Sequence, residues 1–263
     1  MSVSPADEQL ARSILDWFDV DGRDWPWRAS RDPWVVLVSE VCLQQTQVAR
    51  GAVYVERILD RFPQPPDLAV AELGELLAMW QGLGYPRRAR NLWLAAQQVT
   101  ETGWPERLRD LPGVGPYTEA AIRCFAYEEP VLPPDINTRR VLARVYPAGA
   151  PDHGTFPLLG ERAWAWGQAV MELGQTACTA KAKCGTCVLE QLCPSAGTEE
   201  VIASPRQKRY AGSMRERRGT LLRAVTDAGA TAWDSDPEAA ESLVTDGLAT
   251  RGGTEHELLL PPR

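Results

Sequence analysis

Four of the six cysteines lie within sixteen residues, at Cys178, Cys184, Cys187 and Cys193. Thiolates this close in sequence can enclose one tetrahedral metal ion or one cubane iron–sulfur cluster. The spacing does not repeat as two Cys-x2-Cys pairs, as it does in most zinc ribbons. The pattern therefore predicts a metal centre and favours an iron–sulfur cluster, while a zinc ion stays open.

The segment Leu111–Thr118 reads Leu-Pro-Gly-Val-Gly-Pro-Tyr-Thr. Gly113 and Gly115 flank Val114, which predicts a tight turn between two helices with bare N–H groups where the second helix begins. Such N–H groups bind phosphate well, because the orphan donors and the helix dipole both favour an anion. The segment indicates a DNA phosphate site, and an ordinary helix–turn–helix connection is the alternative.

Two carboxylates stand where an amphipathic pattern does not require them. Glu40 interrupts the apolar helical run Val-Leu-Val-Ser-Glu-Val-Cys-Leu, and a buried carboxylate is costly unless it is paired or functional. Asp135 follows two prolines and precedes Ile-Asn-Thr, which is equally typical of a helix N-cap. Both residues are candidates for acid–base or electrostatic work.

Helices must position these groups, because apolar residues recur at helical spacing along most of the chain. Ser4-Pro5 and Asp32-Pro33 are helix starts, and turn signals rich in proline and glycine separate the later elements. No alternating strand pattern occurs before residue 247. The sequence predicts an all-α protein with further helices near 48–61, 68–79, 86–101, 116–127, 137–146 and 155–173.

Charge is distributed unevenly over the 263 residues, whose net charge is −7. Residues 178–218 hold eight basic and four acidic side chains, and 219–263 hold three basic and eight acidic ones. Because phosphates respond to local patches, the overall acidity does not exclude DNA as a partner. Apolar runs are too short to cross a bilayer, and the first ten residues do not resemble a signal peptide. A cytoplasmic protein with no membrane contact is expected.

The composition changes after Ala203. Residues 204–218 are basic and predict a linker or arm that contacts phosphates. Helices are expected at 215–228 and 237–246, followed by a hairpin around Gly252-Gly253. This segment predicts a small C-terminal module that resembles a winged helix.

Several motifs occur together in a recognisable order. They are Trp-Pro-Trp-Arg at 25–28, Ser-Glu-Val-Cys-Leu-Gln-Gln-Thr-Gln-Val at 39–48, Gly-Leu-Gly-Tyr at 82–85, Leu-Pro-Gly-Val-Gly at 111–115, Asp-Ile-Asn at 135–137, Met-Glu-Leu-Gly at 171–174 and the cysteine cluster. Over residues 8–194 the chain resembles the helix-hairpin-helix (HhH-GPD) DNA glycosylase superfamily, and within it the MutY adenine glycosylases. The resemblance implies a six-helix barrel over 22–130, a domain with a [4Fe-4S] cluster on the four cysteines over 1–21 and 131–203, and an extension over 204–263.

The resemblance also implies roles for the carboxylates. Glu40 matches the general acid that protonates the base, and Asp135 matches the carboxylate that stabilises positive charge on the sugar. Asn137 matches a residue that helps to place water. Tyr117 stands where strand-cleaving relatives such as endonuclease III carry a lysine, and a phenol cannot form a Schiff base. A monofunctional glycosylase follows.

Further residues match family positions that touch DNA, although packing or surface roles stay open for each. Gln45, Thr46, Leu83 and Tyr85 resemble residues that fill the gap left by a flipped base and touch its partner. Trp27, Arg28 and Glu172 resemble the wall of the adenine pocket. The implied partner is double-stranded DNA with a mispaired or damaged base, bound by a monomer.

Three departures from the family limit the substrate assignment. The first cysteine gap is one residue short, Ile136 replaces a common glycine, and the long C-terminal domain that recognises 8-oxoguanine is missing. Removal of adenine opposite 8-oxoguanine or guanine is the leading function. The alternatives are a thymine or uracil mismatch glycosylase, an endonuclease III-like enzyme, and a non-catalytic binder of DNA structure. Two carboxylates facing phosphates would not help a mere binder.

Overall fold

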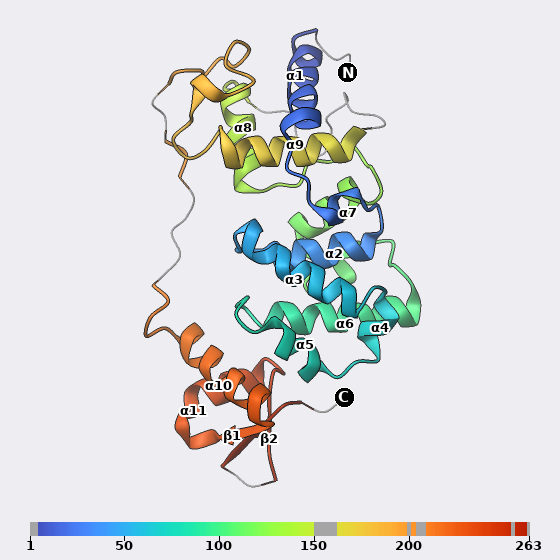
Figure 1. Ribbon diagram of the computed structural model, residues 1–263, viewed down its shortest axis with the longest axis vertical. Helices are drawn as coiled ribbons and strands as arrows, with labels where there is room; N and C mark the ends of the chain where they lie inside the picture. The colour runs from blue at the N-terminus through green and yellow to red at the C-terminus, as the bar shows by residue number, and fades with distance from the viewer. Residues whose placement is uncertain (1–4, 150–161, 199–200, 204–208, 254–255, 262–263) are drawn as a thin grey trace. The chain divides into compact units, whose positions relative to one another are not determined.

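The computed structural model describes residues 5–149, 162–198, 201–203, 209–253 and 256–261, and most of them are helical, as predicted (Figure 1). Packing divides the chain into a first unit, residues 1–37 and 115–206, and a second, residues 38–114 and 207–263. The three sequence segments expected above have other boundaries, at 21/22, 130/131 and 203/204. No described helix is long and apolar enough to cross a membrane.

The first unit is built on three packed helices. Its elements are α1 (Pro5–Asp21), the 3-10 turn η1 (Pro26–Ala29), the start of α2 (Pro33–Leu43), α7 (Pro116–Phe125), α8 (Ile136–Val145), α9 (Ala163–Thr176) and the 3-10 turn η4 (Cys184–Thr186). Ile14 on α1, Val141 on α8 and Trp166 on α9 are buried in one core. The predicted start of α9 near 155 lies outside the described residues.

Two glycines let α9 approach its neighbours closely. A Cβ at Gly167 would lie 2.7 Å from the Cys124 sulfur on α7, and one at Gly174 would lie 2.6 Å from Cβ of Asn137 on α8. Real side chains do not pack at such distances. Gly174 therefore presses α9 against the start of α8, where two of the candidate site residues lie.

The second unit holds the rest of α2 and a group of antiparallel and crossing helices. They are α3 (Val48–Arg61), α4 (Pro65–Ala69), α5 (Leu73–Trp80), α6 (Arg87–Thr102) and the 3-10 turn η2 (Leu108–Asp110). The single helix predicted over 68–79 is wrong. The chain ends α4 at Ala69 and begins α5 at Leu73, because Pro65 and Pro66 start a short helix of their own that buries Leu68.

The C-terminal module of the second unit contains the two predicted helices and the predicted hairpin. Its elements are α10 (Met214–Ala228), β1 (Ala230–Ala232), the 3-10 turn η5 (Trp233–Ser235), α11 (Pro237–Thr245), β2 (Thr250–Arg251) and β3 (Glu257–Leu259). The strands form an antiparallel sheet in the order β1-β3-β2, with buried Leu258 at its centre. β1 was not predicted, because three residues carry no readable alternation.

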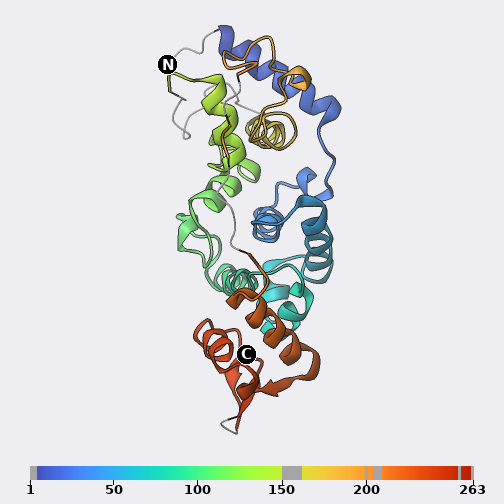
Figure 2. The ribbon, with the colours of Figure 1, turned by 90° about the vertical axis from the view of Figure 1, so that its left-hand side faces the viewer.

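The module packs onto the helices of the second unit, and α10 lies against α5 (Figure 2). A Cβ at Gly74 would lie 2.7 Å from Cδ1 of Leu260. Gln81 at the end of α5 donates to the carboxylate of Asp227 at 3.0 Å. Arg87 lies 3.6 Å from the Asp246 carboxylate. The tail therefore packs directly against the helices of this unit.

The predicted basic arm is partly wrong. Arg217 and Arg218 belong to α10 and pair within the module, Arg217 with Asp236 and Glu238, Arg218 with Asp246. These contacts raise the pKa of Arg217 and lower that of Asp236. Two of the arginines expected to meet phosphates are already occupied by carboxylates of their own module.

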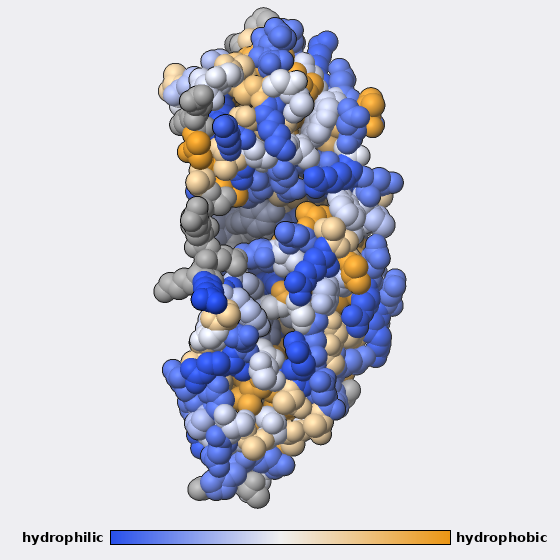
Figure 3. All heavy atoms as spheres, turned by 60° about the vertical axis from the view of Figure 1, so that its left-hand side comes forward, coloured by the Kyte–Doolittle hydropathy of each residue, from blue (hydrophilic) through white to orange (hydrophobic). Residues whose placement is uncertain are grey.

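Hydrophobic residues are dispersed over the face drawn in Figure 3, where they form small separate groups among hydrophilic ones. Exposed large apolar side chains, such as Val53 on α3 and Val70 after α4, are few among the described residues. Scattered residues of this kind are normal for a protein surface.

Candidate functional site

Asp135 is the N-cap of α8, so the capping interpretation of this residue is confirmed. Its Oδ1 accepts hydrogen bonds from the backbone N–H of Thr138 at 2.7 Å and from the Thr138 hydroxyl. Its Oδ2 accepts from Nδ2 of Asn137 at 2.6 Å. The carboxylate is half-buried and held on both oxygens. A charge fixed in this way can stabilise positive charge without reorganising.

Arg140 extends this arrangement, although no motif in the sequence indicated this residue. Its guanidinium donates to Oδ1 of Asn137 at 2.8 Å and to the carbonyl of Gly174 at 3.2 Å. Burial lowers the pKa of Arg140, and the nearby Asp135 charge acts in the opposite direction. The i, i+3 spacing from Asn137 could have indicated the pair. The chain Arg140–Asn137–Asp135 sets the direction in which the Asn137 amide points.

The hairpin motif has a tight turn with a positive backbone angle at Gly113, where φ is 79°. A Cβ there would lie 2.8 Å from Cβ of Asn91, so only glycine fits. The Val114 N–H donates to the carbonyl of Leu111 at 3.1 Å and is therefore already paired. Gly115 is the N-cap of α7, whose first amides have no partner within the helix.

Tyr117 is the second residue of α7 and is half-buried. The chain contains three lysines, Lys181, Lys183 and Lys208, and none of them lies near this motif in sequence. No primary amine of a side chain precedes residue 181. The hairpin itself cannot supply the amine that a Schiff base needs.

Glu40 lies in α2 of the second unit and is 8% exposed. Val38 and Cys42 on either side are fully buried, so α2 is apolar nearly all round. Burial raises the pKa of the Cys42 thiol to about 12, which keeps it a neutral packing group. Glu40 is thus the one carboxylate of a buried helix.

Arg88 connects the end of α2 with the loop at 82–85, a role that no motif in the sequence indicated. Its Nη1 donates to the carbonyls of Val41 at 2.7 Å and Gln44 at 2.8 Å. Its Nη2 donates to the carbonyls of Leu83 at 3.2 Å and Gly84 at 3.0 Å. Burial lowers the pKa of Arg88. One guanidinium therefore joins the segments that carry all four predicted DNA-gap residues.

Both segments have unusual backbones. Gln45 and Tyr85 have positive φ angles of 55° and 51°, which side-chain-bearing residues rarely adopt. Gly82 and Gly84 are also positive, and a Cβ at Gly82 would meet the Tyr54 hydroxyl at 2.7 Å. Strained positions of this kind persist where the surroundings fix them.

Thr46 and Leu83 are the other two gap residues. The hydroxyl of Thr46 donates to the carbonyl of Gln44 at 3.3 Å. Leu83 is 6% exposed and packs inward. Their neighbours are more accessible to solvent: Gln45, next to Thr46, is exposed, and Tyr85, two residues after Leu83, is half-buried.

Arg28 and Glu172 meet in the first unit. Nη1 of Arg28 lies 2.7 Å from Oε2 of Glu172, whose side chain is 1% exposed. The backbone N–H of Arg23 donates to the other carboxylate oxygen at 2.9 Å. Trp27 is buried and stacks on Trp25 with ring centroids 5.2 Å apart. The three predicted pocket residues thus include a buried ion pair with its own structural role.

The four cysteines line one small cavity of about 20 Å³ in the first unit. Nη1 of Arg144 donates to the Cys178 sulfur at 3.3 Å. Burial raises the pKa of the Cys187 and Cys193 thiols. Among the described residues, no three His, Cys, Asp or Glu side chains form a group that could hold a single metal ion. Four soft donors around one cavity nevertheless match the donor set of an iron–sulfur cluster.

The fold and these motifs define a DNA glycosylase of the helix-hairpin-helix class. The profile of the "HhH-GPD superfamily base excision DNA repair protein" family matches residues 38–164. The chain belongs to this superfamily and, within it, to the adenine DNA glycosylase family. It is 36% identical to the adenine DNA glycosylase of Mycolicibacterium smegmatis, over 94% of this chain and 93% of that protein.

Other relatives show how far the match extends. The adenine DNA glycosylase of Mycobacterium tuberculosis (strain H37Rv) is 38% identical over 91% of this chain and 90% of its own length. The mouse adenine DNA glycosylase is also 38% identical, but only 44% of its length is covered. The C-terminal module is thus matched within proteins of similar length, whereas the mouse protein has much more chain.

Solved structures share the fold. A thermostable thymine-DNA glycosylase superposes with a TM-score of 0.64 at 26% identity, over 73% of this chain and 96% of that one. Endonuclease III in a non-covalent DNA complex superposes with a TM-score of 0.58 at 21% identity, over 74% and 97%. The family match and the adenine DNA glycosylase relatives show that the protein is a DNA-binding enzyme of base excision repair.

Proposed function

We propose that this protein removes adenine from adenine·8-oxoguanine and adenine·guanine mispairs as a monomer, leaving an abasic site. The observation that carries the proposal is identity of 36% and 38% to adenine DNA glycosylases over more than nine-tenths of the chain. The position of Glu40 within a buried helix supports it, because a purely structural position in such a helix would favour an apolar residue.

The chemistry assigns one task to each residue. Glu40 donates a proton to N7 of the flipped adenine, the C1′–N9 bond breaks, and adenine leaves as a neutral base. Asp135 stabilises the positive charge that develops on the deoxyribose. Asn137 orients the water that adds to C1′, and the proton of this water passes to the carboxylate of Glu40, which restores the acid. Gly113, Val114 and Gly115 place the hairpin on the DNA backbone, where the positive end of the α7 dipole favours a phosphate.

The remaining site residues act around the base. Gln45, Thr46, Leu83 and Tyr85 fill the gap in the helix, which keeps the adenine extruded. Trp27, Arg28 and Glu172 form the wall against which the base lies. A second candidate is removal of thymine or uracil opposite guanine, which the 26% identity to a thymine-DNA glycosylase favours. A panel of mispaired duplexes distinguishes this activity from adenine removal.

Excision of adenine without strand cleavage is the expected result on a panel of mispaired duplexes. Alkali should convert the abasic product to a nick, whereas untreated product should stay intact, because Tyr117 offers no amine. Borohydride should trap no protein–DNA adduct, as measured on a denaturing gel, with endonuclease III as the positive control. Release of thymine but not adenine, or efficient trapping, would contradict the assignment.

We propose that Cys178, Cys184, Cys187 and Cys193 hold a [4Fe-4S] cluster. When bound, such a cluster serves here as a structural cross-link of four thiolates that orders the segment after α9. Purified protein should be brown and contain about four irons per chain by elemental analysis. Cys42→Ser, which alters a buried thiol outside the cluster, should keep the iron, and Cys187→Ser should lose it. A colourless protein with one zinc would overturn this proposal.

A further inference from the structure

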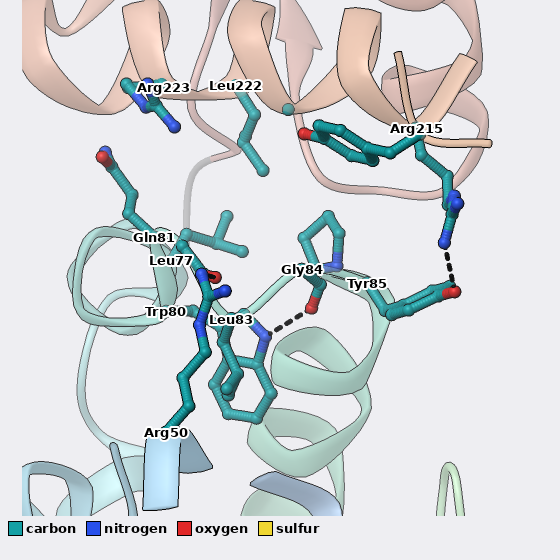
Figure 4. A pocket seen from close by; sticks show the side chains of 14 residues that line it. Arg50, Leu77, Trp80, Gln81, Leu83, Gly84, Tyr85, Arg215, Leu222 and Arg223 are labelled. Atoms are coloured by element: carbon teal, nitrogen blue, oxygen red, sulfur yellow. Dashed lines mark hydrogen bonds between the residues drawn. The ribbon is translucent and has the colours of Figure 1, made fainter. Parts of the chain in front are cut away.

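A cavity of about 460 Å³ lies between the C-terminal module and the loop at 82–85, within the second unit (Figure 4). Its volume is in the range of about 300–1,000 Å³ that is typical of small-ligand sites. Residues of α3, of the end of α5, of the loop and of α10 line it. Leu83 and Tyr85, which the proposed function places in the gap of the DNA helix, belong to its lining, and the lining residues of α3, α5 and α10 have no role in that proposal.

The cavity is positively charged. Arg50, Arg215 and Arg223 line it, and no acidic side chain is among the described lining residues. Nη2 of Arg50 donates to the Gly82 carbonyl, and Nη1 of Arg215 donates to the Tyr85 hydroxyl at 2.5 Å. The exposed Arg223 guanidinium has no ion-pair partner in the part of the chain that the structure describes. Arg223 extends from α10 toward the loop (Figure 4).

Helix α10 sorts its arginines by face. Arg215, Gly219, Leu222 and Arg223 follow one helical stripe, at i, i+4, i+7 and i+8, and this stripe lines the cavity. The arginines at 217 and 218 lie on another face and pair with carboxylates on and beside α11. Arg217 and Arg218 therefore stabilise the module through their ion pairs, whereas the positive charges of Arg215 and Arg223 lie at the cavity.

Aromatic rings complete the walls. The Arg215 guanidinium carbon lies 5.5 Å from the centroid of the Tyr85 ring and 5.6 Å from that of Tyr210. Tyr210 is 55% exposed, and a Cβ at Gly219 would lie 3.5 Å from its hydroxyl. Tyrosine rings can stack on bases and guanidinium groups can bind phosphates, so these walls carry side chains suited to a nucleotide.

We propose that this cavity binds one nucleotide of the DNA, with the phosphate against Arg223 and Arg50 and the sugar and base against Tyr210. The proposal rests on DNA being the substrate and not on which base is removed. The acidic helix α11, with Glu238 and Glu241, does not face the DNA in this arrangement. Contact is made by the cavity stripe of α10 together with the loop.

The test compares Arg223→Ala with Arg251→Ala, which removes the same charge from the same module outside the cavity. Binding to an undamaged duplex is measured over a range of salt concentrations. Arg223→Ala should weaken binding about tenfold and reduce the salt slope by about 1, and Arg251→Ala should change neither. Arg223→Lys should keep the slope. Equal effects of the two alanine variants would overturn the proposal.

Phosphate ethylation interference locates the contact. With the parent protein, ethylation of the phosphate that Arg223 contacts should weaken binding. With Arg223→Ala, ethylation of the same phosphate should have no effect. Thermal unfolding should be unchanged, because the Arg223 head group is exposed. If no phosphate loses its effect, the proposal fails.

Calorimetric titration with deoxyguanosine monophosphate tests whether the cavity binds a nucleotide within DNA or a free nucleotide. If Arg223→Ala loses the free nucleotide but keeps the parental affinity for DNA, the cavity serves a free ligand and the proposal fails. Because these measurements need no excision, a protein that keeps the Arg223 contact but releases no adenine would overturn only the proposed function.

Discussion

Asp135→Asn should lower the single-turnover rate of adenine excision by about 10²-fold or more, and Glu40→Gln should do the same. Asn at 135 keeps the cap of α8 but removes the negative charge that stabilises the sugar cation. Gln at 40 keeps the volume of a buried side chain but cannot donate a proton to the base. Rates are measured on an adenine·8-oxoguanine duplex with alkali quenching.

Binding separates catalysis from folding in these variants. Both should bind the same duplex with at least parental affinity, because Asp135→Asn removes a negative charge near phosphates and Glu40→Gln replaces a neutral acid by a neutral side chain of the same size. Glu8→Gln, an exposed carboxylate on α1, is the matched control and should excise at the parental rate. Parental rates in both site variants would show that the site lies elsewhere.

Arg28→Met should lower the free energy of unfolding by about 3 kcal/mol, because it leaves the buried Glu172 carboxylate with less compensation. The loss should lie at the lower end of the usual range, since Arg23 stays within 3.6 Å of that carboxylate. Chemical denaturation followed by circular dichroism measures the effect.

Two further variants isolate the cause. Arg12→Met breaks an exposed pair with Glu8 and should cost less than about 1 kcal/mol. Adding Glu172→Gln to Arg28→Met should restore part of the lost stability, because no buried charge then remains. If Arg28→Met and Arg12→Met cost the same, the buried pair has no special weight in stability.

Local patterns predicted the helices well where the apolar period was long and well bounded. α3 and the core face of α1 follow directly from their spacing. The break between α4 and α5 and the strand β1 were not predicted. Each involves only a few residues, and tertiary contacts rather than a local sequence pattern determine their conformation. Boundaries of units depend in the same way on contacts far apart in sequence.

The candidate site also contains residues that could be predicted from the sequence and residues that could not. Glu40 and Asp135 were predicted, because a carboxylate within a short motif already indicates its chemistry. Arg88 and Arg140 were not predicted, because their roles exist only when distant carbonyls and amides come within reach of one guanidinium. The prediction of a basic arm was partly wrong because it counted Arg217 and Arg218 without the carboxylates on and beside α11 that pair with them.

The position of Arg88 has a thermodynamic consequence for DNA binding. Ordering one loop residue costs about 1–2 kcal/mol of conformational entropy. With Arg88 holding both Gln44 and Gly84, the backbones that carry Gln45 and Tyr85 are ordered before DNA arrives. The entropy loss then falls on folding of the protein and not on each encounter with DNA. The protein can therefore search many undamaged base pairs without ordering the backbones at Gln45 and Tyr85 again at each of them.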